Sequence, residues 1–123
     1  MLKLSTIIFQ GLTGASALVA IFGDRVFPLL ADQKTPVNYI TYSVRFLNSG
    51  SKDGVGVYEV RIENYHKTYN EACEGSDLIK AAMKALLQGT PENIYKFSEG
   101  TKEPYITEDE KEHYIEQKFN ITI

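Results

Sequence analysis

The chain of 123 residues has no tryptophan, one cysteine, two histidines and four prolines. The single cysteine, Cys73, excludes an intrachain disulfide, so the sequence does not require an oxidising compartment. A zinc site normally takes more histidine or cysteine than this chain has. A basic excess is also absent, because the formal net charge is −3. This charge argues against general attraction to nucleic acid or to anionic lipid.

The composition is that of an ordinary soluble globule, with 43% hydrophobic and 24% charged residues. A chain of this length suits one domain with a single modest core, so we predict one domain over residues 1–123. No internal repeat or low-complexity tract interrupts it.

The first twenty residues share some features with an export signal, including Lys3 and the small residues Ala15-Ser16-Ala17. The uncharged run is broken by Gln10-Gly11 and Thr13-Gly14, however, whereas a signal peptide has one compact apolar stretch behind a more basic start. We therefore expect no secretion by a signal peptide, and two short amphipathic helices in its place.

The first of these helices is predicted over residues 2–10, where Gly11 ends it. The second is predicted over 13–22, with Thr13 as its N-cap and Gly23 in the position where a left-handed cap is easiest.

Alternating residues predict most of the strands. A short extended piece over 25–28 stops at a proline, and residues 38–46 and 57–66 alternate between apolar and polar side chains. The turn-rich segment 47–56 joins the two longer strands. Residues 115–123 form a final alternating strand.

Between these strands, Thr68 and Glu71 form a capping box that opens a helix running to about Gln88. A weaker strand is predicted over 93–98, followed by a polar loop to about His113. The resulting order predicts an α+β fold, a two-layer sandwich whose mostly antiparallel sheet of about four strands has helices packed on one face.

Catalytic and metal-binding readings find little support. Cys73 lies near a helix start, where the dipole favours a thiolate, and His66 is a conceivable partner, but no third orienting group or oxyanion loop accompanies them. The run from Glu108 to His113 has no fixed ligand spacing and is predicted to be a solvated charge run. The glycines form neither phosphate-binding pattern. We therefore expect no enzyme activity, no metal and no cofactor.

Outward-facing polar residues give a better candidate site. Glu59, Arg61 and Glu63 share the outer face of the strand over 57–66, which suits either a solvated face or contact with a neighbouring subunit. The adjoining turn-rich segment adds further candidate interface residues: Asn48, Lys52 and Asp53.

The segment GDRVFPLLADQKTPVNYITYSV (23–44) resembles the phage tail-completion proteins, also called tail terminators or head–tail joining proteins, of long non-contractile-tailed phages and prophages. The likeness continues in the strand and helix from VYEVRIENYH to ALLQG and in the closing YITEDEKEHYIEQKFNITI. Asn38 departs from the pattern, where a second proline is expected before the tyrosine.

That resemblance implies a structural virion protein: a ring, commonly of six subunits, that caps the finished tail tube and docks it to the head connector. Its implied partners are further copies of itself, the major tail tube protein and the head–tail connector proteins, with no membrane and no specific nucleic acid. It implies assembly in the host cytoplasm and residence in the virion.

Three alternatives remain open at this stage. The chain could be a connector-side adaptor or minor tail protein, or a small non-catalytic host module that recognises a peptide along a sheet edge. The third alternative is an enzyme, which a deep pocket holding His66, Cys73 and a carboxylate together would favour.

Overall fold

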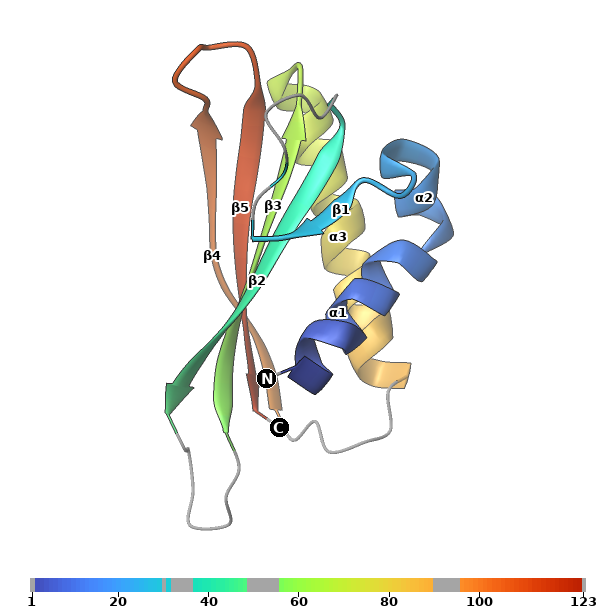
Figure 1. Ribbon diagram of the computed structural model, residues 1–123, viewed down its shortest axis with the longest axis vertical. Coiled ribbons are helices and arrows are strands. Elements are labelled where there is room, and N and C mark those ends of the chain that lie inside the picture. Colours follow the sequence, from blue (N-terminus) through green and yellow to red (C-terminus); the bar gives the residue numbers. More distant parts are fainter. Residues whose placement is uncertain (1, 30, 32–36, 49–55, 90–95, 123) are drawn as a thin grey trace.

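The computed structural model describes residues 2–29, 31, 37–48, 56–89 and 96–122. One sheet carries three helices on a single face (Figure 1). The helices are α1 (Leu2–Gly14), α2 (Ser16–Phe22) and α3 (Tyr69–Gly89). The strands are β1 (Val26–Pro28), β2 (Tyr39–Asn48), β3 (Val57–His66), β4 (Lys96–Ile106) and β5 (His113–Thr122).

The sheet is five-stranded in the order β1-β2-β3-β5-β4. β1 pairs with β2 in parallel, and the other three pairings are antiparallel. The predicted α+β fold is therefore confirmed, with a fifth strand contributed by the short piece before Pro28.

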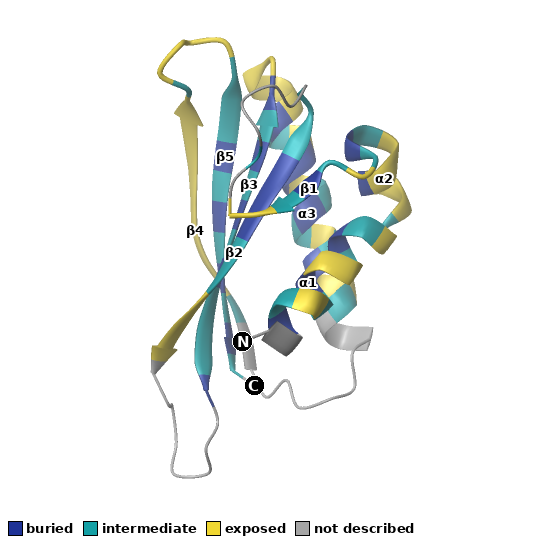
Figure 2. Cartoon of the chain, in the orientation of Figure 1, coloured by how far each residue is buried: buried dark blue, intermediate teal, exposed yellow. Residues whose placement is uncertain are grey.

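The core lies between the sheet and the helices. Its buried side chains include members of all three helices and of β1, β2, β3 and β5 (Figure 2): Leu4, Ile8, Leu12, Leu18, Phe22, Val26, Ile40, Tyr42, Val60, Ile62, Ile79, Met83, Phe119 and Ile121. On α3 the small residues Gly75 and Ser76 are also buried. Close packing of helix on sheet follows from those small side chains.

The two N-terminal helices are confirmed, but their predicted boundary is wrong. α1 continues through Gly11 to Gly14, and the break falls at Ala15. Thr13 is not an N-cap, because its hydroxyl donates to the carbonyl of Phe9 at 2.7 Å inside α1. Gly11 remains helical because it lies against the Leu86 side chain of α3, so packing outweighs the weak helix propensity of glycine.

The other helix signals are confirmed. Gly23 ends α2 with a φ of 59° and donates its amide to Val19 at 2.9 Å. The Thr68 hydroxyl accepts the Glu71 amide at 3.2 Å and donates to the Glu71 carboxylate at 3.0 Å, which completes one half of the capping box and ties the two side chains together.

The predicted polar loop before His113 is wrong. β4 runs from Lys96 to Ile106 through Gly100 and Pro104, and only 107–112 form the connection to β5. Both residues are tolerated because β4 is an edge strand: its register shifts between Glu99 and Lys102, around Gly100, and a proline on an edge need not donate to a neighbour.

Among the described residues no single helix is long and apolar enough to cross a membrane. Leu4–Gly14 and Ser16–Phe22, bent by 80° at their break, meet the criterion only as a pair, by length and composition.

Candidate functional site

The face of the sheet that the helices leave uncovered carries the predicted residues of β3. Val60 and Ile62 point into the core, so Glu59, Arg61 and Glu63 lie on the open face, as their alternation predicts. Asn48 is the last residue of β2, and Lys52 and Asp53 lie outside the described residues. The structure therefore places three of the six predicted residues on one continuous surface.

A row of four tyrosines crosses this open face, one from each of four neighbouring strands. Tyr39, Tyr65, Tyr114 and Tyr105 are paired in register across β2, β3, β5 and β4. Their rings stack with centroid distances of 4.5 Å for Tyr39–Tyr65, 4.6 Å for Tyr65–Tyr114 and 5.2 Å for Tyr105–Tyr114. Cross-strand aromatic pairs of this kind stabilise a sheet and leave a firm aromatic surface.

A row of three glutamates lies beside the tyrosines. Glu63, Glu116 and Glu103 are direct cross-strand neighbours, an arrangement that is unfavourable for like charges. Two cations offset it, because Arg61 Nε lies 3.8 Å and Lys118 Nζ 3.6 Å from the Glu116 carboxylate.

Tyrosine hydroxyls supply the remaining compensation. Tyr65 donates to Glu63 at 2.7 Å and Tyr105 donates to Glu103 at 2.5 Å. The hydrogen bond to Glu103 raises the pKa of Tyr105 to about 12, and burial, followed by the bond to Glu63, raises that of Tyr65 above its usual range. Both hydroxyls thus stay protonated donors at neutral pH.

Further along the open face, an ion pair joins Arg45 of β2 to Glu59 of β3 at 3.3 Å. The surface therefore combines stacked aromatic rings with charges of both signs. Such a combination suits contact with another protein surface, since aromatic and arginine side chains are enriched at interfaces. The tyrosine row escaped sequence reasoning, because each tyrosine occupies an ordinary alternating position and only the strand order brings the four together.

His66 lies on the covered face and is almost fully buried. Its Nδ1 is 3.0 Å from Asn38 Oδ1 and its Nε2 is 2.8 Å from Asn64 Oδ1, so both ring nitrogens have asparagine partners. Burial lowers the pKa of His66, against an opposing effect of Glu71. Cys73 is half-buried on α3. Nucleophilic catalysis would require a hydrogen bond between Cys73 and His66, but the ring nitrogens of His66 contact these two asparagines.

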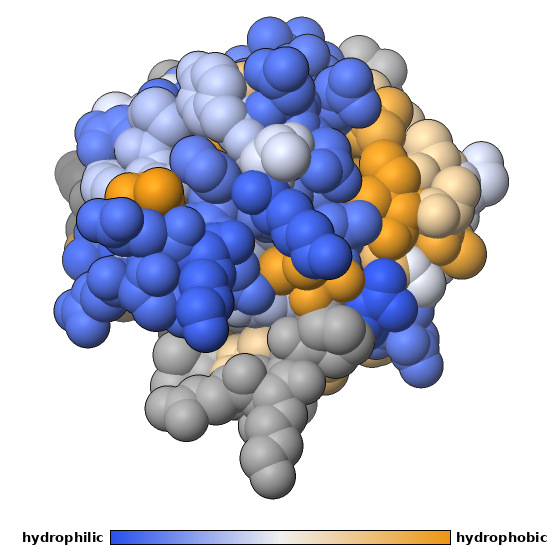
Figure 3. All heavy atoms as spheres, turned by 90° about the horizontal axis from the view of Figure 1, so that it is seen from above, coloured by the Kyte–Doolittle hydropathy of each residue, from blue (hydrophilic) through white to orange (hydrophobic). Residues whose placement is uncertain are grey.

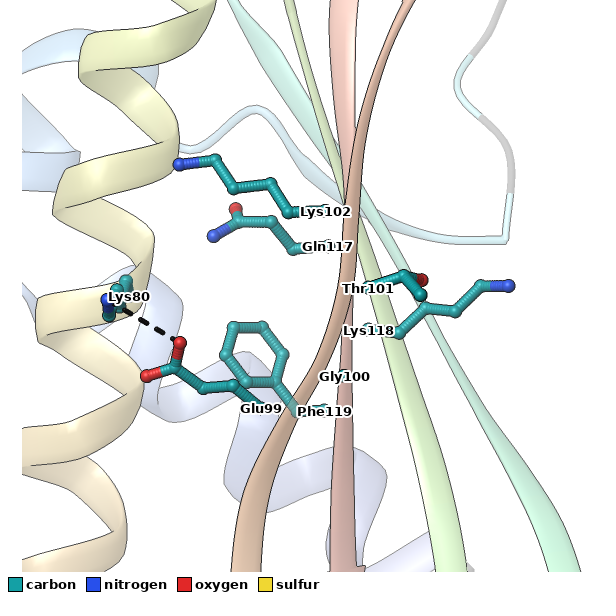
Figure 4. A pocket seen from close by; sticks show the side chains of 8 residues that line it. All are labelled: Lys80, Glu99, Gly100, Thr101, Lys102, Gln117, Lys118 and Phe119. Atoms are coloured by element: carbon teal, nitrogen blue, oxygen red, sulfur yellow. Dashed lines mark ion pairs between the residues drawn. The ribbon is translucent and has the colours of Figure 1, made fainter.

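Two cavities lie near these elements. One, of about 270 Å³, is lined by Ala20, Ile21, Asn38, His66, Glu71 and Glu74. The other holds about 50 Å³ between α3, β4 and β5, where Lys80 pairs with Glu99 at 3.5 Å (Figure 4). There Gln117 donates to the Ser76 carbonyl at 3.1 Å. Neither cavity brings Cys73 together with His66.

Within the described residues, no group of three histidine, cysteine, aspartate or glutamate side chains is arranged to hold a metal ion. Seen from above, the molecule is largely hydrophilic, with hydrophobic side chains gathered toward the side on which α2 lies (Figure 3).

No protein-family model matches the sequence, and no curated protein is similar to it in sequence. In structure the chain is similar to a chain of the virion of a native gene transfer agent particle. The two share a TM-score of 0.66 at 16% sequence identity, over 97% of this chain and 92% of that one. The likeness therefore concerns the whole fold and not a fragment of it.

Proposed function

We propose that this chain is a structural protein of a phage-like virion, which terminates the tail tube and joins it to the head connector as an oligomeric ring. The observation that carries the proposal is the fold shared, over nearly the whole chain, with a chain of a gene transfer agent virion. The sequence resemblance to phage tail-completion proteins supports the finer role, and a ring of six is the assembly that this resemblance implies.

The open face of the sheet fits such a role. It offers a broad surface of stacked tyrosines and paired charges, including Glu59, Arg61 and Glu63, and its Arg61 and Lys118 side chains are engaged with Glu116. We assign this face to contact with the tail tube or with the head connector. The work of the protein would then be assembly, with no chemical turnover.

Light scattering coupled to size exclusion tests the proposal over a range of concentrations, alone and with the major tail tube protein encoded in the same genome. A ring-sized species, formed by the chain alone or on tube ends, is the expected result. A strict monomer that also ignores the tube protein would contradict it.

Separate pull-downs with the tube protein and the connector proteins distinguish the related roles. Capture by both supports a joining ring at the end of the tube. Capture by the connector alone favours a connector-side adaptor, whose fold the virion likeness fits equally well.

A further inference from the structure

Exposed apolar side chains gather at the two opposite edges of the sheet. Phe9, Leu29 and Phe46, which we call the β2-edge patch, are 38%, 72% and 50% exposed. At the end of β4, Tyr105 and Ile106 are 40% and 50% exposed and, as consecutive strand residues, point to opposite faces of the sheet; we call this edge position the β4-edge patch. Figure 2 shows both β4 and the far end of β2 as exposed.

Two members of the β2-edge patch, Phe9 and Leu29, adjoin one buried residue, Tyr42. The Phe9 ring lies 6.2 Å from the Tyr42 ring, and the Leu29 amide donates to the Tyr42 carbonyl at 2.8 Å. Phe46 follows on the same face of β2. β1 pairs only with residues 40–42 of β2, so the rest of that edge has no partner strand within the described chain.

Leu29 is the most informative member of this patch. Its backbone has a φ of 66°, a conformation that asparagine or glycine adopts at lower cost than leucine. Its side chain is largely exposed, so burial within the chain does not repay that cost. A strained position that holds an apolar side chain out into solvent is explained by a contact outside the chain.

Both edges are poorly suited to strand addition. Pro28 ends β1, and β4 contains Pro104 together with the register shift near Gly100. Prolines and bulges on edge strands block pairing with another strand. Where β1 and β4 form the edges, the patches therefore offer side chains to a partner, not a regular strand edge.

We propose that the β2-edge patch of one copy packs against the β4-edge patch of the next copy, head to tail, and that this contact is the seam of the ring. This inference rests on the proposed function. A closed ring of identical subunits needs two different patches that do not overlap, one on each side of the subunit, and the opposite edges of this sheet supply them. A single foreign partner would require only one.

The charges beside the patches are complementary as well. Arg45, whose side chain is 63% exposed and pairs with Glu59 within the chain at 3.3 Å, lies next to Phe46 on β2. The β4-edge patch continues into the turn over 107–112, which has four carboxylates and one lysine. Opposite charges at the two edges favour head-to-tail contact over contact between like edges.

The first test replaces Leu29 by asparagine. Because asparagine tolerates a positive φ, the melting temperature of the monomer should stay the same or rise, while self-association weakens by about tenfold or more. Val19→Asn is the matched control, since Val19 is 44% exposed on α2 and lies outside both patches. Ile106→Thr, which keeps a β-branched residue in the strand, should weaken association in the same way.

The second test uses cross-linking to determine which patches face each other between two copies. In a Cys73→Ser background, Leu29→Cys and Ile106→Cys proteins are mixed and treated with a short bis-maleimide. Cross-links between one variant and the other should predominate, with few within either variant alone. Cross-links mainly between two Leu29→Cys copies would overturn the head-to-tail seam.

The outcomes separate the two proposals. A chain that oligomerises unchanged when Leu29 and Ile106 are replaced refutes the seam and leaves the ring intact. A chain that stays monomeric with and without the tube protein contradicts the proposed function itself.

Discussion

The two faces of the sheet come from the same strands but carry different kinds of side chain. On β3, Val60 and Ile62 are fully buried under the helices, while Glu59, Arg61 and Glu63 lie on the open face. The covered face is determined by packing within the chain, and the open face is occupied by tyrosines and paired charges. Substitutions at neighbouring positions of one strand should therefore differ strongly in their cost to stability.

The largest effect on the free energy of unfolding is expected from Ile62→Ala. Ile62 has no exposed surface, so the loss of its buried methyl and methylene groups and the cavity left behind should lower the free energy of unfolding by about 3 kcal/mol. Arg61→Ala, one residue away on the open face, is the matched control and should cost less than about 1 kcal/mol. Urea denaturation measures both, and equal losses would show that the open face is also part of the folding core.

Gly75→Ala should have the next largest effect. An added Cβ would collide with Asn64 Oδ1 and come within 2.8 Å of His66 Nε2, both buried and hydrogen-bonded. We expect a loss of about 2 kcal/mol, because the helix must move away from the sheet or the asparagine–histidine contact must break. Gly14→Ala, which meets no atom within 4 Å at the end of α1, is the control and should be neutral or slightly stabilising. Thermal unfolding measures both variants. Equal melting temperatures would show that the contact between α3 and the sheet at Gly75 tolerates an added methyl group.

The decrease of stability at acid pH tests the role of the buried His66. Because burial lowers the pKa of folded His66, the unfolded chain takes up a proton first as the pH falls below the ordinary value of about 6.5. Stability should therefore decrease from there down to the lower pKa of the folded state, and then level off for this group. His66→Gln should flatten that part of the curve. An unchanged slope in His66→Gln would exclude this assignment.

The smallest effect is expected from the ion pair on the open face. Arg45 and Glu59 lie 3.3 Å apart with the arginine side chain largely exposed, so a double-mutant cycle with alanine should give a coupling of about 0.5 kcal/mol or less. High salt should reduce it further. A coupling several times larger would mean that this pair helps to hold the sheet together, which contradicts the division between the two faces.

Sequence reasoning succeeded where a local pattern determines the structure. The alternation of Glu59 through Glu63 predicts which side chains face outward, and Thr68 with Glu71 predicts the start of α3. It failed where tertiary contacts override local preference. The polar segment before His113 suggested a loop, but the edge strand β4 accommodates Gly100 and Pro104, and Gly11 stays helical against Leu86.

The candidate surface was only partly within reach of the sequence. Glu59, Arg61 and Glu63 follow from periodicity within one strand. The tyrosine row requires the strand order and the register of four strands, and the strain at Leu29 requires its backbone angle. Neither property is encoded in the neighbouring residues alone, which is why both emerge only from the folded chain.

The most direct test of the proposed function is to delete the gene from the genome that encodes it and to examine the particles by electron microscopy. The account predicts heads and tail tubes that accumulate separately, with tubes of irregular length, and rescue by the unaltered chain. Complete particles with normally joined tails would contradict it.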